Sequence, residues 1–226
     1  MNYFGIVMEF LRDRIKFLQN VRNGKHLEKY IISFVLCSAF FFAIYGGIMG
    51  SFSGGLQAIA SAIKLPALYL LTLLICLPAL FFFNVVSGSK RTFLHYFCLL
   101  LASMSAISVM LFGFAPIVLF FRLSINDYLF FTLLNIVVLA ASSFIGVQFF
   151  YRSMHFINDL QGKQKIRSIS AVKGWLVLYG FVGSQLGWTL RPFFGVPGAE
   201  FEFFRPVESN FYAALLQIFG KILGLY

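Results

Sequence analysis

Two carboxamide side chains are the groups in this sequence best placed to do chemistry inside a membrane. Asn135 and Gln185 lie near the middle of two long apolar stretches. An amide without a hydrogen-bonding partner costs several kcal/mol in hydrocarbon, so each side chain needs a partner. Two interpretations are open: the amides join neighbouring helices, or they line a polar path or a ligand pocket. The hydroxyls that could join either arrangement are Ser108, Ser142, Ser143 and Ser184.

No catalytic or metal-binding motif accompanies these amides. His95, His155 and Asp159 could meet near one membrane surface, but their spacing matches no compact ligand motif. The sequence contains no nucleophile elbow, zinc-protease helix or phosphate-binding loop in a suitable setting. We therefore expect no metal, no cofactor and no enzymatic activity, and a membrane enzyme that uses these three groups is the least supported hypothesis. No charged residue stands at the centre of an apolar span, which disfavours a proton-driven carrier.

The composition places the chain in a membrane. Hydrophobic residues make up 60% of the 226 residues and charged residues 12%, which is about half the charged share of a globular protein. A soluble domain of this size could not bury so much apolar surface, whereas a bilayer hides it. The three cysteines, Cys37, Cys76 and Cys98, lie in or beside apolar stretches and predict buried thiols without disulfides.

The apolar stretches predict an all-α, polytopic transmembrane bundle with five spans. A span needs about 20 residues at 1.5 Å per residue. The predicted spans are 30–50, 65–86, 93–121, 128–151 and 174–190, in a bundle that covers residues 30–190. Residues 51–64, which are rich in Gly, Ser and Ala, are predicted to be a short connection outside the spans. Pro78 is expected to kink the second span because it removes one backbone hydrogen bond.

Amphipathic helices are predicted at both termini. Apolar residues recur three or four apart along residues 3–22, namely Phe4, Val7, Leu11, Ile15 and Leu18. We expect this helix, within a cytoplasmic segment 1–29, to lie on the membrane surface; packing on a partner or on a cytoplasmic loop is the alternative. Residues 191–226 are predicted to be extracytoplasmic, with a loop followed by a second interfacial helix at 210–226. The alternative for 210–226 is a sixth span.

The distribution of basic residues predicts the orientation. Segments 1–29, 87–93 and 152–173 carry six, two and five of the 18 Lys and Arg residues. The positive-inside tendency assigns these segments to the cytoplasm, with the N-terminus inside and the C-terminus outside. The protein is thus predicted to be a multi-pass protein of the inner (cytoplasmic) membrane. Because the net charge of +10 is concentrated beside the spans, it predicts contact with anionic lipid and not with nucleic acid.

Small residues and one arginine suggest where the helices touch. Pairs of small residues four apart allow close helix approach; here they are Gly46 and Gly50, Ser142 and Gly146, and Gly183 and Gly187. Arg191 follows the last span directly. It either extends to lipid headgroups or pairs with Glu200, Glu202 or Asp127 and clamps the following segment onto the bundle.

One stretch resembles a known family. Ser87-Gly88-Ser89-Lys90-Arg91-Thr92-Phe93-Leu94, followed by an apolar run to Ala115-Pro116, is similar to the turn and span of Yip1-domain membrane proteins. The resemblance implies five spans, a cytosolic N-terminus and a non-enzymatic role in membrane organisation or trafficking. The Asp-Leu-Tyr-Gly-Pro element of eukaryotic members is absent before the first span. Gly183 to Phe194 and Asn210-Phe211-Tyr212 resemble a recurrent family of bacterial multi-span proteins.

The sequence therefore favours a non-enzymatic membrane protein that packs against itself or against other membrane proteins, as a scaffold or assembly subunit. The alternative is an oligomeric channel or passive transporter, lined by Asn135, Gln185 and the nearby serines. The expected partners are the lipid bilayer, with anionic lipid on the cytoplasmic side, and a second copy or another membrane protein.

Overall fold

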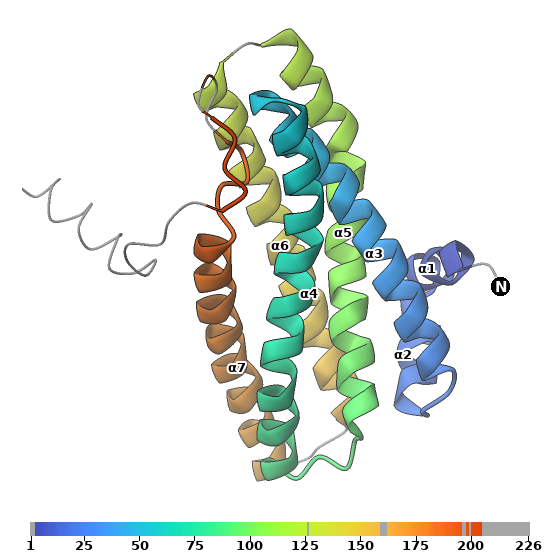
Figure 1. Cartoon of the computed structure of the whole chain (residues 1–226). Coiled ribbons are helices and arrows are strands. Elements are labelled where there is room, and N and C mark those ends of the chain that lie inside the picture. The colour runs from blue at the N-terminus through green and yellow to red at the C-terminus, as the bar shows by residue number, and fades with distance from the viewer. Residues whose placement is uncertain (1–2, 126, 159–161, 196–197, 199, 205–226) are drawn as a thin grey trace, which may run out of the picture.

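The structure, a computed structural model, describes residues 3–125, 127–158, 162–195, 198 and 200–204, with the backbone alone for 162–167. Within these ranges the chain forms a bundle of long helices and no strand (Figure 1). The elements in order are α1 (Tyr3–Arg12), α2 (Arg14–Arg22), α3 (Leu27–Gly50), the short 3-10 helix η1 (Ser51–Ser53), α4 (Gly55–Val86), α5 (Phe93–Ser124), α6 (Tyr128–Asn158) and α7 (Gly162–Thr189).

Four helical segments in the described part of the chain are long and apolar enough to cross a membrane. They are Leu27–Ser53, Gly55–Val86, Phe93–Ser124 and Tyr128–Asn158. This confirms the predicted all-α class and is compatible with a multi-pass membrane protein. The fifth predicted span, 174–190, lies within α7, which is as long as the others but falls outside this set because it is less apolar.

The long helices run alternately up and down the bundle (Figure 1). Helix α3 packs against both α4 and α5, α6 packs against α5, and α7 lies along α4 at the edge. We call the end with η1 and the close of α7 the η1 end, and the opposite end, with the α4–α5 turn and the start of α7, the α2 end. The core between the helices is made of large apolar side chains that are fully buried, such as Phe42, Tyr45, Leu77 and Leu99.

The closest helix contact joins α3 to α4 through glycines. A Cβ atom on Gly46 would lie closer than 3.0 Å to the backbone carbonyl of Ser61, and one on Gly50 would meet the carbonyl of Gln57 equally closely. The contact requires α4 to be helical from Gly55, ten residues before the predicted start at Leu65. The prediction that 51–64 is a connection is therefore wrong beyond Gly54. Ala58 and Ala62 of this stretch lie beside Gly47 of α3, whereas Gly54 and Gly55 face open space.

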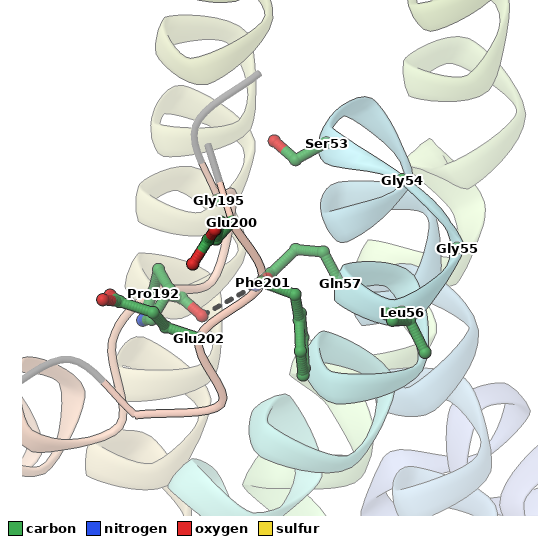
Figure 2. A pocket seen from close by; sticks show the side chains of 10 residues that line it. All are labelled: Ser53, Gly54, Gly55, Leu56, Gln57, Pro192, Gly195, Glu200, Phe201 and Glu202. Carbon is green, nitrogen blue, oxygen red and sulfur yellow. Dashed lines mark hydrogen bonds between the residues drawn. The ribbon is translucent and has the colours of Figure 1, made fainter. Parts of the chain in front are cut away.

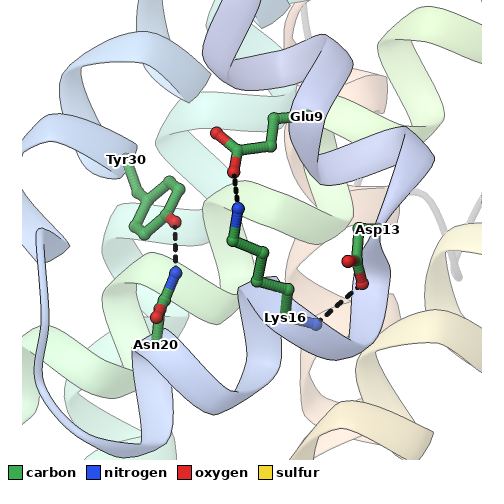
Figure 3. Close-up of polar contacts among 5 residues, drawn as sticks. All are labelled: Glu9, Asp13, Lys16, Asn20 and Tyr30. Carbon is green, nitrogen blue, oxygen red and sulfur yellow. Dashed lines mark hydrogen bonds and ion pairs between the residues drawn. The ribbon is translucent and has the colours of Figure 1, made fainter.

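The N-terminal region forms two helices instead of the one predicted for 3–22. Helix α1 ends at Arg12, and the Asp13 carboxylate caps α2 by accepting a hydrogen bond from the Lys16 amide at 2.9 Å (Figure 3). The break turns the two helices differently, so the predicted apolar stripe is divided. Its members Val7 and Leu18 are buried, whereas Phe4, Leu11 and Ile15 are exposed.

The buried faces of α1 and α2 pack on the bundle through aromatic rings. Phe10 contacts Phe34 of α3 and Phe149 of α6, with ring centroids 5.2 and 5.4 Å apart. Asn20 donates a hydrogen bond to the Tyr30 hydroxyl at 3.1 Å, and Lys16 pairs with Glu9 at 2.7 Å (Figure 3). The two helices are thus part of the folded unit, and their remaining exposed face is rich in apolar side chains.

Candidate functional site at the η1 end

The segment after α7 lies against the first turns of α4 and makes several polar contacts with it. We call its described residues, 191–195, 198 and 200–204, the tail. Its carbonyl groups at Pro192, Phe193 and Phe194 accept hydrogen bonds from side chains of η1 and α4. Figure 2 shows the bond from Gln57 to Pro192. The Tyr128 hydroxyl donates to the Gly195 carbonyl at 2.7 Å. The tail is therefore held by donors from three separate parts of the chain.

Gln57 is the central donor of this contact. Its side chain is 4% exposed, and its amide nitrogen lies 2.9 Å from the Pro192 carbonyl oxygen and 3.3 Å from that of Phe193. Ser61, one turn further along α4, donates to the Phe193 carbonyl. These donors satisfy the backbone of an irregular segment, which in a buried place would otherwise carry unpaired polar groups.

Lys64 anchors the far end of the tail. Its side chain is 1% exposed, and its ammonium group donates to the carbonyls of Pro192, at 3.1 Å, and Phe203. The ammonium also lies 4.8 and 5.2 Å from the ring centroids of Phe203 and Phe204, within the range of a cation–π attraction. Among the described residues no carboxylate pairs with it. Carbonyl dipoles and aromatic faces thus replace a counter-ion for this buried cation.

A cavity of about 180 Å³ lies between the tail and the start of α4 (Figure 2). Its lining consists of Ser53, Gly54, Gly55, Leu56, Gln57, Pro192, Gly195, Glu200, Phe201 and Glu202. The lining combines backbone at the N-terminus of α4, which carries no side-chain cap, with two carboxylates. A helix N-terminus favours negative charge, whereas the two carboxylates favour positive charge. The cavity is therefore polar, and its volume is sufficient for a small polar group.

The structure places the predicted clamp residues in different surroundings. The Arg191 guanidinium lies 3.7 Å from the Trp188 ring centroid, a stacked contact at the end of α7. Glu200 and Glu202 both line the cavity beside Gln57. Gln57, Ser61 and Lys64, which lie in the stretch predicted to be a connection, also hold the tail to the bundle. The sequence did mark Lys64 as unusual, because it is a basic residue directly before an apolar span.

The first predicted carboxamide, Asn135, lies fully buried where α6 faces α3. Its oxygen accepts a hydrogen bond from the Tyr45 hydroxyl at 2.9 Å, and its nitrogen donates to the Phe131 carbonyl at 2.8 Å. Both ends of the amide are engaged inside the helix contact. The geometry is that of an amide that joins two neighbouring helices, which is the first of the two arrangements considered from the sequence.

We expect Asn135→Leu and Tyr45→Phe each to lower the free energy of unfolding by about 1–2 kcal/mol, because each leaves its partner buried without its hydrogen bond. The double variant should lose less than the sum of the single losses. Denaturant titration of the detergent-solubilised protein measures all three. Strictly additive losses would show that the two side chains do not act as a pair. Tyr69→Phe, whose longer hydroxyl contact with Ser143 is 3.3 Å, is the milder control.

The second carboxamide and the predicted serines are dispersed over several helix contacts. Gln185 and Ser184 are half-buried on α7, and the Ser184 hydroxyl donates to the Phe181 carbonyl of its own helix at 2.8 Å. Ser142 is fully buried on α6, and its hydroxyl has no hydrogen-bond partner among the described residues. Ser143 instead meets Tyr69 of α4. These positions are spread over α6 and α7 and do not gather with Asn135 around one described cavity.

The predicted small-residue pairs differ in what they contact. A Cβ on Gly146 would lie closer than 3.0 Å to the Ile107 side chain, which places α6 tightly on α5. On α7, a Cβ at Gly183 would be 3.5 Å from Thr72 of α4, an ordinary contact. Gly187, one turn further, and Gly180, one turn before, have no atom of the described residues within 4 Å of that position. Gly183 thus contacts α4, whereas the glycines one turn before and after it have open space beside them.

A polar network at the α2 end was not predicted from the sequence. The Asn158 amide of α6 donates at 3.0 Å both to Asn84 of α4 and to Ser168 of α7, and its oxygen lies 3.2 Å from the Ser89 hydroxyl. The Tyr96 hydroxyl donates to Ser89 at 2.7 Å. The network joins four helices at one depth. Its signal in the sequence was two asparagines near the C-terminal ends of α4 and α6, two helices that run in the same direction.

Histidines do not form a metal site in the described part of the chain. His95 shares a 2.7 Å hydrogen bond with Thr92, and the His155 ring packs on Tyr151 of its own helix. The described residues contain no group of three or more His, Cys, Asp or Glu side chains that could hold a metal ion. Asp159 and the predicted helix at 210–226 lie outside the described residues.

Comparisons with known proteins assign no family to the chain. No protein-family model matches the chain, and neither a curated protein nor a solved structure matches it.

Proposed function

We propose that this protein is a non-enzymatic membrane protein that acts by helix packing, with α7 as the surface that meets a second copy or another membrane protein. The observation that carries the proposal is the open glycine face of α7. Gly180 and Gly187 are seven residues apart, so they lie on one side of the helix, and neither meets any described atom. Small residues at such positions let a second helix approach closely within a membrane.

The position of α7 supports the same proposal. It has 28 residues, or about 42 Å at 1.5 Å per residue, and it lies along α4 at the edge of the bundle (Figure 1). We take it as the fifth span. It is less apolar than the four other spans, and a polar helix at the edge of a bundle gains more from a protein neighbour than from lipid. The membrane-organising role implied by the Yip1-domain resemblance belongs to the same class.

The proposed orientation has the N-terminus in the cytoplasm and the C-terminus outside, in the inner membrane. It is supported by the way the structure gathers the three basic segments. The Arg91 guanidinium of the α4–α5 turn donates to the Arg22 carbonyl at 2.8 Å and to the Ile157 carbonyl at 3.0 Å. The α2 end thus carries the basic residues of all three segments, which favours the cytoplasmic side. The engaged amide of Asn135 gives no support to a channel.

Cysteine cross-linking in native membranes tests the proposal. In a chain whose three native cysteines are replaced by alanine, Gly187→Cys and Gly180→Cys should each form a cross-linked species, either a dimer of the chain or a complex with one partner. Gly113→Cys on α5 is the matched control, because that glycine is also helical and open. Equal cross-linking at Gly113, or none at the two α7 positions, would contradict the assignment of α7 as the interface.

A further inference from the structure

Two arginines at the contact between α2 and α6 have guanidinium groups that pair with nothing in the described part of the chain. The Arg14 guanidinium lies 4.5 Å from the centroid of the Phe149 ring, within the range of a cation–π attraction. Arg152 follows Phe149 by three residues and so projects from the same side of α6. Among the described residues neither guanidinium forms a hydrogen bond or an ion pair, although each offers five N–H donors.

The acidic side chains nearest in sequence are already engaged. The Glu9 carboxylate pairs with the Lys16 ammonium at 2.7 Å, and the Asp13 carboxylate accepts the Lys16 backbone amide at 2.9 Å (Figure 3). Burial, and secondarily the charge of Arg152, lower the pKa of Arg14. Two like charges held together favour an anion between them.

The surroundings of Arg14 indicate the kind of anion. Leu11, three residues before it, is 43% exposed, and Ile15, directly after it, is 64% exposed. Large apolar side chains that stay exposed beside unpaired cations are the composition of a helix surface at the level of lipid headgroups. A lipid with an anionic headgroup would meet both kinds of side chain, whereas a free phosphate ion would meet only the arginines.

We infer that Arg14 and Arg152 together bind the phosphate of an anionic membrane lipid, with Leu11 and Ile15 against its acyl chains. Guanidinium groups bind phosphate oxygens in a fork of two parallel hydrogen bonds, and a guanidinium already held by a cation–π contact loses less freedom on binding. The site joins α2 to α6 through the lipid. A bound headgroup would therefore hold the N-terminal helices against the bundle.

Native mass spectrometry of the purified chain, with phosphatidylglycerol and phosphatidylcholine added in turn, tests the inference. We expect the unaltered chain to retain phosphatidylglycerol preferentially. Arg14→Gln and Arg152→Gln should each weaken that retention by about tenfold. The matched control is Arg12→Gln, because Arg12 is exposed and close to Arg14 in sequence but does not stack on Phe149. Thermal unfolding of each variant establishes that it is folded.

Three results would overturn the inference: equal retention of phosphatidylcholine, an equal loss in Arg12→Gln, or full retention in the Arg14→Gln, Arg152→Gln double variant. A separate arm adds inorganic phosphate alone. If phosphate protects the chain from thermal unfolding as strongly as the lipid does, and only when both arginines are present, the anion site stands and its ligand is soluble phosphate. The lipid is the ligand if phosphate has no such effect.

Discussion

Gly46→Ala is expected to separate α3 from α4 and to lower the free energy of unfolding by about 2 kcal/mol or more. The added Cβ would lie closer than 3.0 Å to the carbonyl oxygen and carbon of Ser61. Those atoms belong to the backbone of a helix, which cannot turn aside as a flexible side chain can. Relief requires the two helices to move apart, and this movement would also loosen the Gly50 contact one turn away.

Gly47→Ala is the matched control, because it makes the same chemical change at the next residue. There the new Cβ would be 3.8 Å from the Ala62 side chain, an ordinary van der Waals distance. Alanine is favoured over glycine in a helix by up to about 1 kcal/mol, so this variant should be as stable as the unaltered chain or more so. Denaturant titration in detergent measures both variants. Equal stability of the two would show that α3 and α4 are not in the close contact described.

Gln57→Leu, Lys64→Met is expected to release the tail from α4. The double variant removes both donors to the Pro192 carbonyl and the donor to the Phe203 carbonyl, while it keeps side chains of similar volume. Each buried carbonyl left without a partner costs about 1–3 kcal/mol. Hydrogen–deuterium exchange of the amides in residues 193–204 should then be about 100-fold faster, with Gln57→Leu alone giving about tenfold.

The control for this experiment is Gln148→Leu, which makes the same change at an exposed position on α6. It should leave exchange in the tail unchanged. Unaltered exchange in the double variant would mean that Ser53, Ser61 and Tyr128 suffice to hold the tail. In that case the two α4 side chains are not its anchors.

The fold class could be predicted from the sequence because each span carries its own signal. Runs of apolar residues long enough to cross a bilayer marked α3 to α6. The start of α4 could not be found in this way, because Gly54 and Gly55 are typical of a turn and the residues up to Lys64 are less apolar than a span. The structure shows that α4 already begins at Gly55, where Gln57 and Ser61 pack against Gly50 and Gly46 of α3. The broken N-terminal helix could have been found, since Asp13 three residues before Lys16 is a helix-capping position.

The candidate site was harder to predict than the fold because it depends on side chains that meet across long sequence separations. Arg191 and the acidic residues after it suggested a charge clamp. The structure also holds the tail through Gln57 and Lys64, more than 120 residues away, with backbone carbonyls as acceptors. A carbonyl is present in every residue, so no sequence pattern marks it. Asn158 was not predicted for a similar reason. Its hydrogen-bond network forms only because side chains of three other helices lie at the same depth in the bundle.

Helix α4 is longer than the hydrocarbon layer of a bilayer is thick. Its 32 residues extend about 48 Å, whereas the hydrocarbon layer of a bilayer is about 30 Å thick. If Leu65 to Val86 fill that layer, the ten residues before them rise about 15 Å beyond it, with the tail bound along their side. Helices α5 and α6 also extend at this end (Figure 1), so a protein or solute arriving from that aqueous phase would meet the start of α4 and the tail together with the ends of those helices. Deleting two turns from the start of α4 would bring the tail down among the lipid headgroups.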